Sequence, residues 1–305
     1  CTEVEEFNDD LKKTTDKIEK TIEDSILAQQ EWSDLSIIDR VKILQNFVSD
    51  FLSREKIICE EISWQIGRPI SQVPNELRGF KERADFMLSI AENKLKPIEL
   101  AEKENFKNYI KRIPAGIVFV IAPWNYPYLT SVNSIIPALA AGNSVILKHS
   151  AQTPTCAEQL YESANNTLPK NVFSYLHLNH NDGLKVIEDK RIGFVSFTGS
   201  VKAGYEVQKA STNKFISMAL ELGGKDPAYV RADADLDGAI ENLVDGTFFN
   251  SGQSCCGIER IYVQKEVYDD FVSGFVDLVN YPDPRPKGKI MVGMRTVEHV
   301  CFSNL

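Results

Sequence analysis

The sequence has few of the features that mark nucleic-acid-binding or membrane proteins. Its 34 basic residues are outnumbered by 43 acidic ones, for a formal charge of -9, and they form no basic block. We therefore expect no nucleic acid and no membrane among its partners, because both are held by clustered Lys and Arg. The longest apolar run, 135–147, is broken by Gly142 and Asn143 and falls short of the roughly 18 residues that a membrane span needs.

Cysteine and histidine are also sparse. The six cysteines are scattered over 305 residues, unlike the dense spacing of a small secreted disulfide scaffold. We therefore expect a reducing compartment, cytoplasmic or mitochondrial. No CxxC or HxxxH motif occurs, and the four histidines lie far from the adjacent cysteines in the sequence. No metal site is predicted, because zinc needs four ligands at a workable spacing.

What the chain does contain is enough apolar sequence for a large core, with 43% hydrophobic and 10% aromatic residues. Apolar residues recur at helical spacing up to about residue 95, which predicts a helical N-terminal region. From Gly116 onward, short apolar runs alternate with helical segments, a pattern typical of a doubly wound, mainly parallel α/β sheet. We predict a cofactor-binding domain over 1–223 and a partial second α/β domain over 224–305.

The predicted strands and helices place the polar motifs of the chain at the ends of strands. Strands are expected at 116–124, 144–148, 172–177, 192–199, 215–222, 227–230 and 257–264. Helices are expected at 127–141, 154–165, 182–189, 200–210 and 236–249. In a sheet of this kind the ligand binds beyond the carboxyl ends of the strands, so each motif below is a candidate for the site.

The segment FTGSVKAG, residues 197–204, places a turn between a predicted strand and a helix. Ser200 is positioned to cap that helix, which would leave backbone N–H groups and a positive helix end for a phosphate. The spacing matches neither GxGxxG nor a loop ending in GK[ST]. Taken alone, an ordinary strand-to-helix turn is the simpler explanation.

In the segment LELGGKDP, residues 220–227, Glu221 follows an apolar strand. A carboxylate at the mouth of a buried strand is partly desolvated, which raises its pKa and suits a general base. Gly223 and Gly224 would let the backbone turn tightly beside it. A surface glutamate before a turn is the alternative interpretation.

Two further polar side chains follow predicted strands. Prolines on both sides fix the backbone around Trp124 and Asn125, so the Asn125 amide is presented rigidly, as an oxyanion donor must be. A cap for the helix that follows explains Asn125 equally well. Lys148, at the end of the next strand, can reach the ribose hydroxyls or the phosphate of a nucleotide, or extend into solvent.

The adjacent cysteines Cys255 and Cys256 follow a predicted turn at 251–253. One cysteine on such a turn would face a cleft while its neighbour points elsewhere. A disulfide between adjacent cysteines is strained, so a redox pair is not indicated. Buried packing is the usual fate of a cysteine, and by itself it explains the pair better than a nucleophile does.

Taken in order, PWN, the strand-end lysine, FTGS, ELGGK and GQSC resemble the aldehyde dehydrogenase superfamily. Each motif is weak alone, but five in the expected order form a specific pattern, which covers the chain from about residue 20 to about residue 280. The resemblance implies oxidation of an aldehyde to a carboxylate with NAD or NADP as cofactor. The stretch that begins at GRPISQVP is similar to the succinate-semialdehyde dehydrogenase-like branch.

The resemblance also implies roles for the catalytic residues. Cys255, which completes GQxC, would attack the aldehyde carbon, and Cys256 would be a bystander. Asn125 and the backbone N–H of Cys255 would hold the oxyanion. Hydride transfer to the cofactor would leave a thioester, and Glu221 would activate the water that hydrolyses it.

For the cofactor, the resemblance places Ser200 at the pyrophosphate and Lys148 at the adenosine ribose. The other residues implied at the cofactor are Trp124, Ala151, Gly199, Gly204 and Leu222. Family members often carry an acidic residue three positions after the lysine, where it disfavours a 2'-phosphate. Because that position is Ala151 here, we expect tolerance of NADP or preference for it.

The chain also departs from the family in length. Relatives usually continue much further, with an E-x-F-G-P segment and an oligomerising strand that this sequence lacks. Three prolines in 282–286 end the last helix pattern and no clear element follows, which indicates a truncation or an altered reading. Cys1, in place of a start methionine, indicates a processed or partial chain. The cleft would then be open and apolar surface exposed.

Partners and competing functions follow from the same resemblance. A small-molecule aldehyde is the expected partner, and the family is usually homo-oligomeric. Two other functions stay open for a chain of this length. One is a non-catalytic protein that binds the cofactor or serves a structural role. The other is thioester or ester hydrolysis by Cys255 and Glu221 without hydride transfer.

Overall fold

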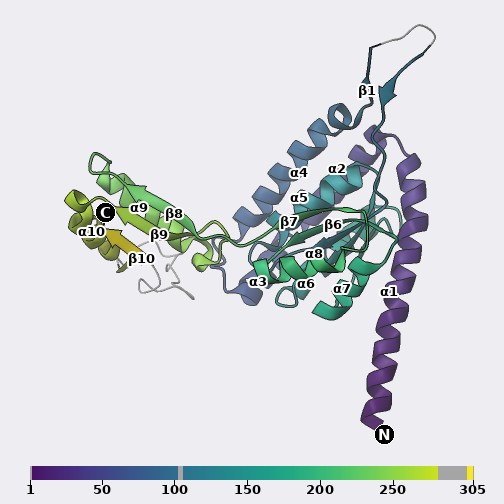
Figure 1. Ribbon diagram of the computed structural model, residues 1–305, viewed down its shortest axis with the longest axis horizontal. Helices are drawn as coiled ribbons and strands as arrows, with labels where there is room; N and C mark the ends of the chain where they lie inside the picture. Colours follow the sequence, from purple (N-terminus) through teal and green to yellow (C-terminus); the bar gives the residue numbers. More distant parts are fainter. Residues whose placement is uncertain (1, 102–105, 281–300, 305) are drawn as a thin grey trace. The chain divides into compact units, whose positions relative to one another are not determined.

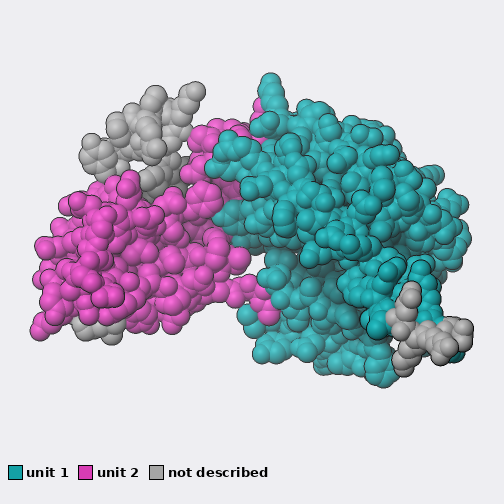
Figure 2. Space-filling model, turned by 90° about the horizontal axis from the view of Figure 1, so that it is seen from above, with its two compact units in different colours: residues 1–58, 75–221 teal, residues 59–74, 222–305 magenta. Residues whose placement is uncertain are grey.

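A computed structural model describes residues 2–101, 106–280 and 301–304. The chain divides into two compact units, coloured in Figure 2: unit 1 comprises residues 1–58 and 75–221, and unit 2 comprises residues 59–74 and 222–305. The expected division differs from this one in the segment 59–74, which groups with unit 2. The reason is that this segment hydrogen-bonds to residues 250–253 of unit 2 through Arg68 and Ile66.

Unit 1 is built on a sheet of five parallel strands (Figure 1). These are β3 (Ile117–Ile121), β4 (Ser144–Lys148), β5 (Phe173–Tyr175), β6 (Ile192–Thr198) and β7 (Ser217–Glu221). Their order is β5-β4-β3-β6-β7, so the chain moves outward from β3 to one side and then to the other. The doubly wound fold is thereby confirmed. Its switch point lies between β3 and β6, where sheets of this kind bind their ligands.

The helices between these strands begin at residues suited to a helix start. They are α5 (Pro127–Ala140), α6 (Pro154–Thr167), α7 (His180–Glu188) and α8 (Val201–Ala210). Prolines open α5 and α6, while Asn179 and Ser200 cap α7 and α8 by accepting a backbone N–H three residues ahead. The predicted helices are therefore confirmed to within a few residues.

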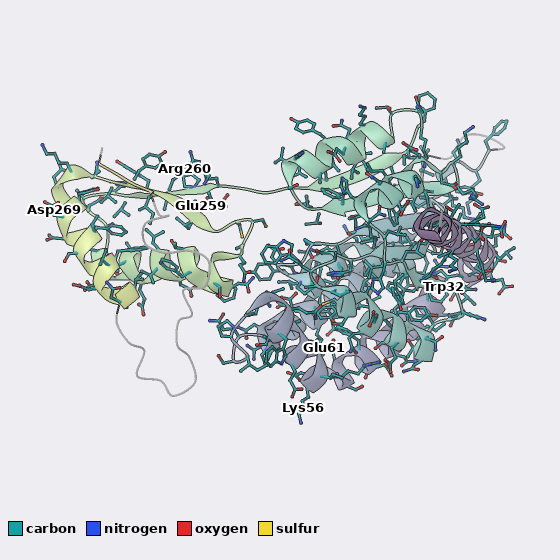
Figure 3. The ribbon with its side chains drawn as sticks, turned by 90° about the horizontal axis from the view of Figure 1, so that it is seen from below. Trp32, Lys56, Glu61, Glu259, Arg260 and Asp269 are labelled. Atoms are coloured by element: carbon teal, nitrogen blue, oxygen red, sulfur yellow. The ribbon has the colours of Figure 1, made fainter. Side chains whose placement is uncertain are left out.

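The predicted helical region precedes the sheet and consists of α1 (Thr2–Asp34), α2 (Ile37–Ser53), α3 (Glu55–Ile66) and α4 (Pro74–Leu95). On α2, the side chains of Leu44, Phe47 and Val48 are buried, as their helical spacing predicts. Trp32 of α1, labelled in Figure 3, is also buried, and its indole N–H donates to the carbonyl of Leu139 at 2.8 Å. This bond fixes α1 against α5.

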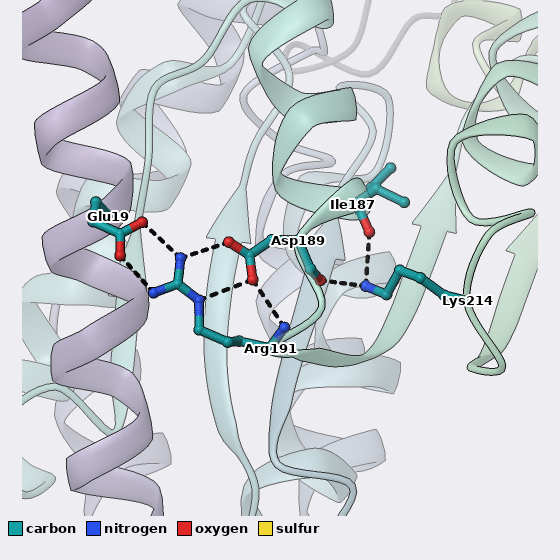
Figure 4. Close-up of polar contacts among 5 residues, drawn as sticks. All are labelled: Glu19, Ile187, Asp189, Arg191 and Lys214. Carbon is teal, nitrogen blue, oxygen red and sulfur yellow. Dashed lines mark hydrogen bonds and ion pairs between the residues drawn. The ribbon is translucent and has the colours of Figure 1, made fainter.

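An ion-pair cluster fixes α1 to the start of β6 (Figure 4). The Arg191 guanidinium donates to both carboxylate oxygens of Glu19 at 2.6 Å, and it also donates to Asp189 at 2.6 Å. These hydrogen bonds lower the pKa of both carboxyls. Lys214 donates to the carbonyl of Ile187 at 2.8 Å and to that of Asp189. The cluster lies at the amino end of β6, so it stabilises the fold away from the strand ends that carry the motifs.

Unit 2 has its own parallel sheet and core. Its strands are β8 (Asp226–Val230), β9 (Ile258–Val263) and β10 (Cys301–Asn304), in the order β10-β9-β8. The helices are α9 (Leu236–Phe248) and α10 (Tyr268–Asn280), with short 3-10 turns η1 (Phe249–Gly252) and η2 (Lys265–Val267). The core comprises Val230, Ile240, Val244, Phe248, Ile261, Val263, Phe271 and Phe275.

Two features of the fold were not anticipated. The expectation that no element follows residue 281 is wrong for the last residues, because β10 pairs in register with β9. The three prolines of that expectation lie outside the described residues. The strands β1 (Ile98–Glu99) and β2 (Tyr109–Ile110) form an antiparallel pair within unit 1. They are too short for an alternating pattern to reveal them.

Candidate active site

The turn after β3 presents Trp124 and Asn125, both half-buried. The alternative role of Asn125 as the cap of α5 is wrong, because the cap position is occupied by Tyr126. The Tyr126 side chain itself makes no capping hydrogen bond. The buried carboxylate of Glu76 caps the helix from α4, accepting the backbone N–H of Tyr128 at 2.9 Å and of Leu129 at 2.8 Å. Asn125 is therefore not needed to cap the helix.

The end of β4 carries Lys148, half-buried with its stem against Gly183 of α7, and burial lowers the pKa of its ammonium. The next residue, His149, is fully buried. Its Nδ1 accepts the backbone N–H of Ser150 at 3.0 Å, so Nε2 carries the proton and donates to the carbonyl of Pro127 at 3.3 Å. This bond links the β4 end to the start of α5. No sequence pattern singled out His149.

The turn after β6 carries Gly199 and Ser200. Ser200 caps α8 as expected, because its hydroxyl accepts the backbone N–H of Ala203 at 3.2 Å. The backbone N–H of Gly199 donates to the carbonyl of Glu221 at 2.9 Å, and that of Gly204 donates to the carbonyl of Ser200 at 2.9 Å. The FTGS and ELGGK motifs are thereby held side by side.

Glu221 ends β7, which is an edge strand of the sheet and only partly buried. The expectation that a buried strand would desolvate this carboxylate is wrong, since the Glu221 side chain is exposed. The expected tight turn at the two glycines is not observed either, because residues 222–225 form no turn and neither glycine has a positive φ. A Cβ on Gly224 would lie 2.4 Å from the carbonyl oxygen of Cys255, whereas one on Gly223 would meet nothing within 4 Å.

The predicted residues of unit 1 lie at the carboxyl ends of the strands, which together form one edge of the sheet, called the sheet edge below. Ile121 pairs with Lys148 on one side and with Phe197 on the other, and Thr198 pairs with Glu221. The backbone register therefore aligns the turns that carry Trp124, Asn125, Lys148, Ser200 and Glu221. Ala151 lies exposed in the turn after β4, and Leu222 begins the second part of unit 2.

The donors at this edge suit a cofactor that carries phosphate. The start of α8 offers backbone N–H groups and the positive end of a helix, next to the switch point between β3 and β6. The Lys148 ammonium adds a positive charge at the end of β4. These groups fit the pyrophosphate and ribose of a dinucleotide without a GxGxxG turn.

The two adjacent cysteines lie in unit 2, on the loop between η1 and β9. Both are free thiols and both are exposed, so the packing interpretation of the pair is wrong. Partial burial of the Cys255 thiol raises its pKa, and the neighbouring Cys256 raises it further. A thiol with a raised pKa needs a base before it can attack a carbonyl. The Cys256 sulfur lies 3.2 Å from the hydroxyl of Ser254.

The backbone leading to Cys255 is unusual. Asn250, Ser251 and Gly252 all have positive φ, at 52°, 57° and 70°. The Asn250 side chain accepts a hydrogen bond from Arg68, and both residues are buried. Gln253 donates to the carbonyl of Ile66 at 3.1 Å. Sequence reasoning identified the turn but missed Arg68 and Asn250, because a pairing across 182 residues leaves no periodic signal.

A cavity of about 310 Å³ lies elsewhere in unit 1, between α5 and strands β3, β6 and β7. Its lining is mostly apolar, and the hydroxyls of Ser134 and Ser196 within it contact each other at 2.7 Å. No titratable side chain lines it, so it does not compete with the strand ends as a reacting site. The lining residues are Ala115, Val118, Asn133, Ser134, Pro137, Ala138, Asn143, Phe194, Ser196 and Ala219.

The described part of the chain offers neither a metal-binding cluster nor a membrane-spanning helix. Among those residues, His, Cys, Asp and Glu side chains never gather in threes as a metal ion would require. In the same residues, every helix is too short or too polar to cross a bilayer.

Comparison with known proteins identifies the family. The model of the aldehyde dehydrogenase family matches residues 5–285. A D-glyceraldehyde dehydrogenase (NADP(+)) of Thermoplasma acidophilum is 31% identical over 269 residues, covering 87% of this chain and 54% of the relative. The lactaldehyde dehydrogenase of Escherichia coli is 30% identical over 290 residues, covering 93% of this chain and 59% of the relative.

The fold agrees with solved structures of the same family. A 3,6-anhydro-L-galactose dehydrogenase in complex with NAP has a TM-score of 0.83 at 28% identity, over 88% of this chain and 56% of that one. The chain thus spans somewhat more than half the length of the relatives it matches. With its ordered motifs, its doubly wound sheet and a family match over nearly all of its residues, the chain belongs to the aldehyde dehydrogenase family.

Proposed function

We propose that the chain carries the cofactor-binding part and the nucleophile of an enzyme that oxidises an aldehyde to a carboxylate with NAD(P). The observation that carries the proposal is Cys255, an exposed free thiol on a loop held by side-chain hydrogen bonds. The sheet edge with Asn125, Lys148 and Ser200 supplies the donors that such a reaction needs. Relatives of known activity are considerably longer, so the activity of this chain is part of the proposal.

The reaction begins when Cys255 gives up its proton to solvent water and its sulfur bonds to the aldehyde carbon. The carbonyl oxygen then takes the negative charge, which the Asn125 amide and the backbone N–H of Cys255 stabilise. The bound nicotinamide supplies the acceptor for the hydride, so the carbon is oxidised and stays on sulfur as a thioester. Glu221 takes a proton from water, which attacks the thioester and releases the carboxylate and the free thiol.

The cofactor would be held by Lys148 and Ser200, with the backbone of the Gly199 turn beside them. Trp124, Gly204 and Leu222 complete the proposed cofactor site. We further propose that NADP is accepted, because Ala151 offers no negative charge to repel a 2'-phosphate. The relative from Thermoplasma acidophilum, whose name specifies NADP(+), supports this choice.

A turnover assay tests the proposal. The protein is mixed with NADP or NAD and a panel of aliphatic aldehydes and semialdehydes, and the reduced cofactor is followed by its absorbance. We expect turnover that is abolished by Cys255→Ala and retained in Cys256→Ala. Turnover that survives Cys255→Ala but is lost in Cys256→Ala would contradict the assignment of the nucleophile. Cofactor binding without turnover by any aldehyde would contradict the activity itself.

A further inference from the structure

The residues that lead to Cys255 are fastened at two points to residues 66–68 of the segment 59–74. Arg68, at 3% exposure, donates to the side chain of Asn250, which is completely buried. Three residues after Asn250, Gln253 donates to the carbonyl of Ile66 at 3.1 Å. All these residues belong to unit 2, although they are far apart in the sequence.

Further hydrogen bonds close the network. The Asn250 amide donates to the carbonyl of Gln253 at 3.4 Å, and the Gln253 amide donates to the carbonyl of Asn250 at 3.1 Å. On the opposite side, the hydroxyl of Ser63 donates to the carbonyl of Arg68 at 2.9 Å. The turn that presents the Arg68 guanidinium is therefore itself held in place.

The loop needs this support because its backbone is in a conformation that most residues avoid. Asn250 and Ser251 have φ values of 52° and 57°, in the left-handed region. Such residues persist only where the surrounding structure over-determines them. These two consecutive residues lie five and four positions before Cys255, so their conformation sets the direction of the backbone that leads to the cysteine.

We propose that Arg68 is a positioning residue for the nucleophile. Its buried guanidinium fixes Asn250 in the left-handed conformation, and through Asn250 it orients the backbone N–H of Cys255 toward the oxyanion. This inference rests on the proposed role of Cys255. It assigns the segment 59–74, which the sequence places among the N-terminal helices, to the catalytic apparatus.

The test separates the orientation of the loop from the presence of a thiol. Acylation of Cys255 by 4-nitrophenyl acetate needs the oxyanion donor, whereas alkylation by iodoacetamide needs only the thiolate. Both rates are measured on the Cys255 peptide by mass spectrometry, in Arg68→Met and in Asn250→Gly, each in protein that also carries Glu221→Gln so that the thioester is not hydrolysed. The glycine keeps the left-handed backbone accessible while it removes the amide. Arg54→Met and Ser251→Gly are the matched controls, an arginine of unit 1 and a left-handed residue outside the network.

We expect Arg68→Met and Asn250→Gly to slow acylation about tenfold each, the usual effect of losing one hydrogen bond to a charged group. Alkylation should be unchanged, and the double variant should be no slower than either single one. Amide hydrogen exchange of 250–256 should become faster in both variants and stay as in wild type in the two controls. Arg68→Lys, which keeps a donor, should recover part of the rate.

Two results would overturn the inference. One is acylation and exchange in Arg68→Met equal to wild type. The other is a parallel loss of acylation and alkylation, which would mean that Arg68 only keeps unit 2 folded. If Arg68→Met does not fold, the same comparison is made with Asn250→Gly. The failure of the proposed function is distinct, because it appears as absent aldehyde turnover in the wild-type protein while acylation still depends on Arg68.

Discussion

The two units position their reactive groups in different ways. In unit 1, parallel strands in register bring Asn125, Lys148, Ser200 and Glu221 to one edge, and the backbone ladder fixes their relative heights. In unit 2, Cys255 lies on a loop that no ladder constrains. Side-chain hydrogen bonds of Arg68 and Gln253, together with consecutive left-handed residues, take the place of the ladder.

This difference indicates how each unit responds to mutation. A substitution at the sheet edge removes one functional group and leaves the frame intact, because the backbone pairing does not depend on the side chain. A substitution in the cysteine loop changes the frame itself. Four predictions probe the two units separately, from the largest expected effect to the smallest.

The largest effect is expected at the sheet edge. Asn125→Ala should lower aldehyde turnover by ~10² to 10³, the usual cost of one oxyanion donor, while the protein still unfolds in a cooperative transition. Steady-state kinetics measure the first and thermal unfolding the second. Asn133→Ala, an exposed asparagine on α5, is the control and should behave as wild type. A loss below a few-fold in Asn125→Ala would remove this residue from the oxyanion site.

The second prediction concerns the buried His149, whose pKa is lowered from 6.5 to about 4, mainly by burial and also by the charges of Lys148 and His177, against the opposing hydrogen bond to Pro127. Because the unfolded chain binds the proton more readily, the stabilisation is complete above pH 6.5 and is lost as the pH falls toward 4. The histidine should therefore account for about 3 kcal/mol of the acid-induced loss of unfolding free energy.

Urea unfolding across this pH range measures the effect of His149. In His149→Gln the free energy of unfolding should fall less steeply between pH 6.5 and pH 4 than in wild type. His180→Gln removes an exposed histidine that pairs with Glu206 and is not among the groups that shift the pKa of His149, so this variant is the control and should retain the wild-type slope. Equal slopes in wild type and His149→Gln would show that the histidine does not stay neutral in the folded protein.

The third prediction probes the frame of the cysteine loop. Gly224→Ala should destabilise unit 2 by about 1–3 kcal/mol and slow acylation of Cys255, because the new Cβ would overlap the Cys255 carbonyl oxygen. Gly223→Ala meets no atom and should change neither property. Urea unfolding and acylation rates compare the two variants. Identical stability and acylation rates in both variants would mean that the cysteine loop can move away from the new Cβ without loss of stability or reactivity.

The smallest effect is expected for cofactor choice. Ala151→Glu should lower the efficiency with NADP relative to NAD about tenfold, since a carboxylate repels the 2'-phosphate and accepts the ribose hydroxyls. Gln152→Glu adds the same charge one position further along the exposed turn and serves as the control. A preference unchanged in Ala151→Glu, or changed equally in both variants, would argue against a role for this position.

The sheet edge was predictable from the sequence because buried parallel strands are continuous apolar runs. Their last residues, such as Lys148 and Thr198, mark where polar groups begin. Proline and capping residues fixed the starts of the helices for the same local reason. Glu221 was misjudged in its burial, since a strand sequence alone does not tell an edge strand from a central one.

The support of the cysteine was not predictable in this way. The roles of Arg68, Asn250 and Glu76 depend on contacts between residues far apart in the chain. Arg68 and Glu76 lie in the N-terminal region, where periodicity reports only which helix faces are apolar. Hydrophobic periodicity does not show that a charged side chain is buried. The structural role of such a side chain is identified only when the structure shows its hydrogen-bond partner.

The most direct test of the central claim is to locate the covalent bond. Glu221→Gln protein is treated with 4-nitrophenyl acetate, which transfers its acetyl group to the nucleophile and releases 4-nitrophenolate, and the modified peptide is sequenced by mass spectrometry. With the base removed, the thioester should persist as a single acetyl group on Cys255. An acetyl group on Cys256, or an equal acylation rate in Cys255→Ala, would contradict the account.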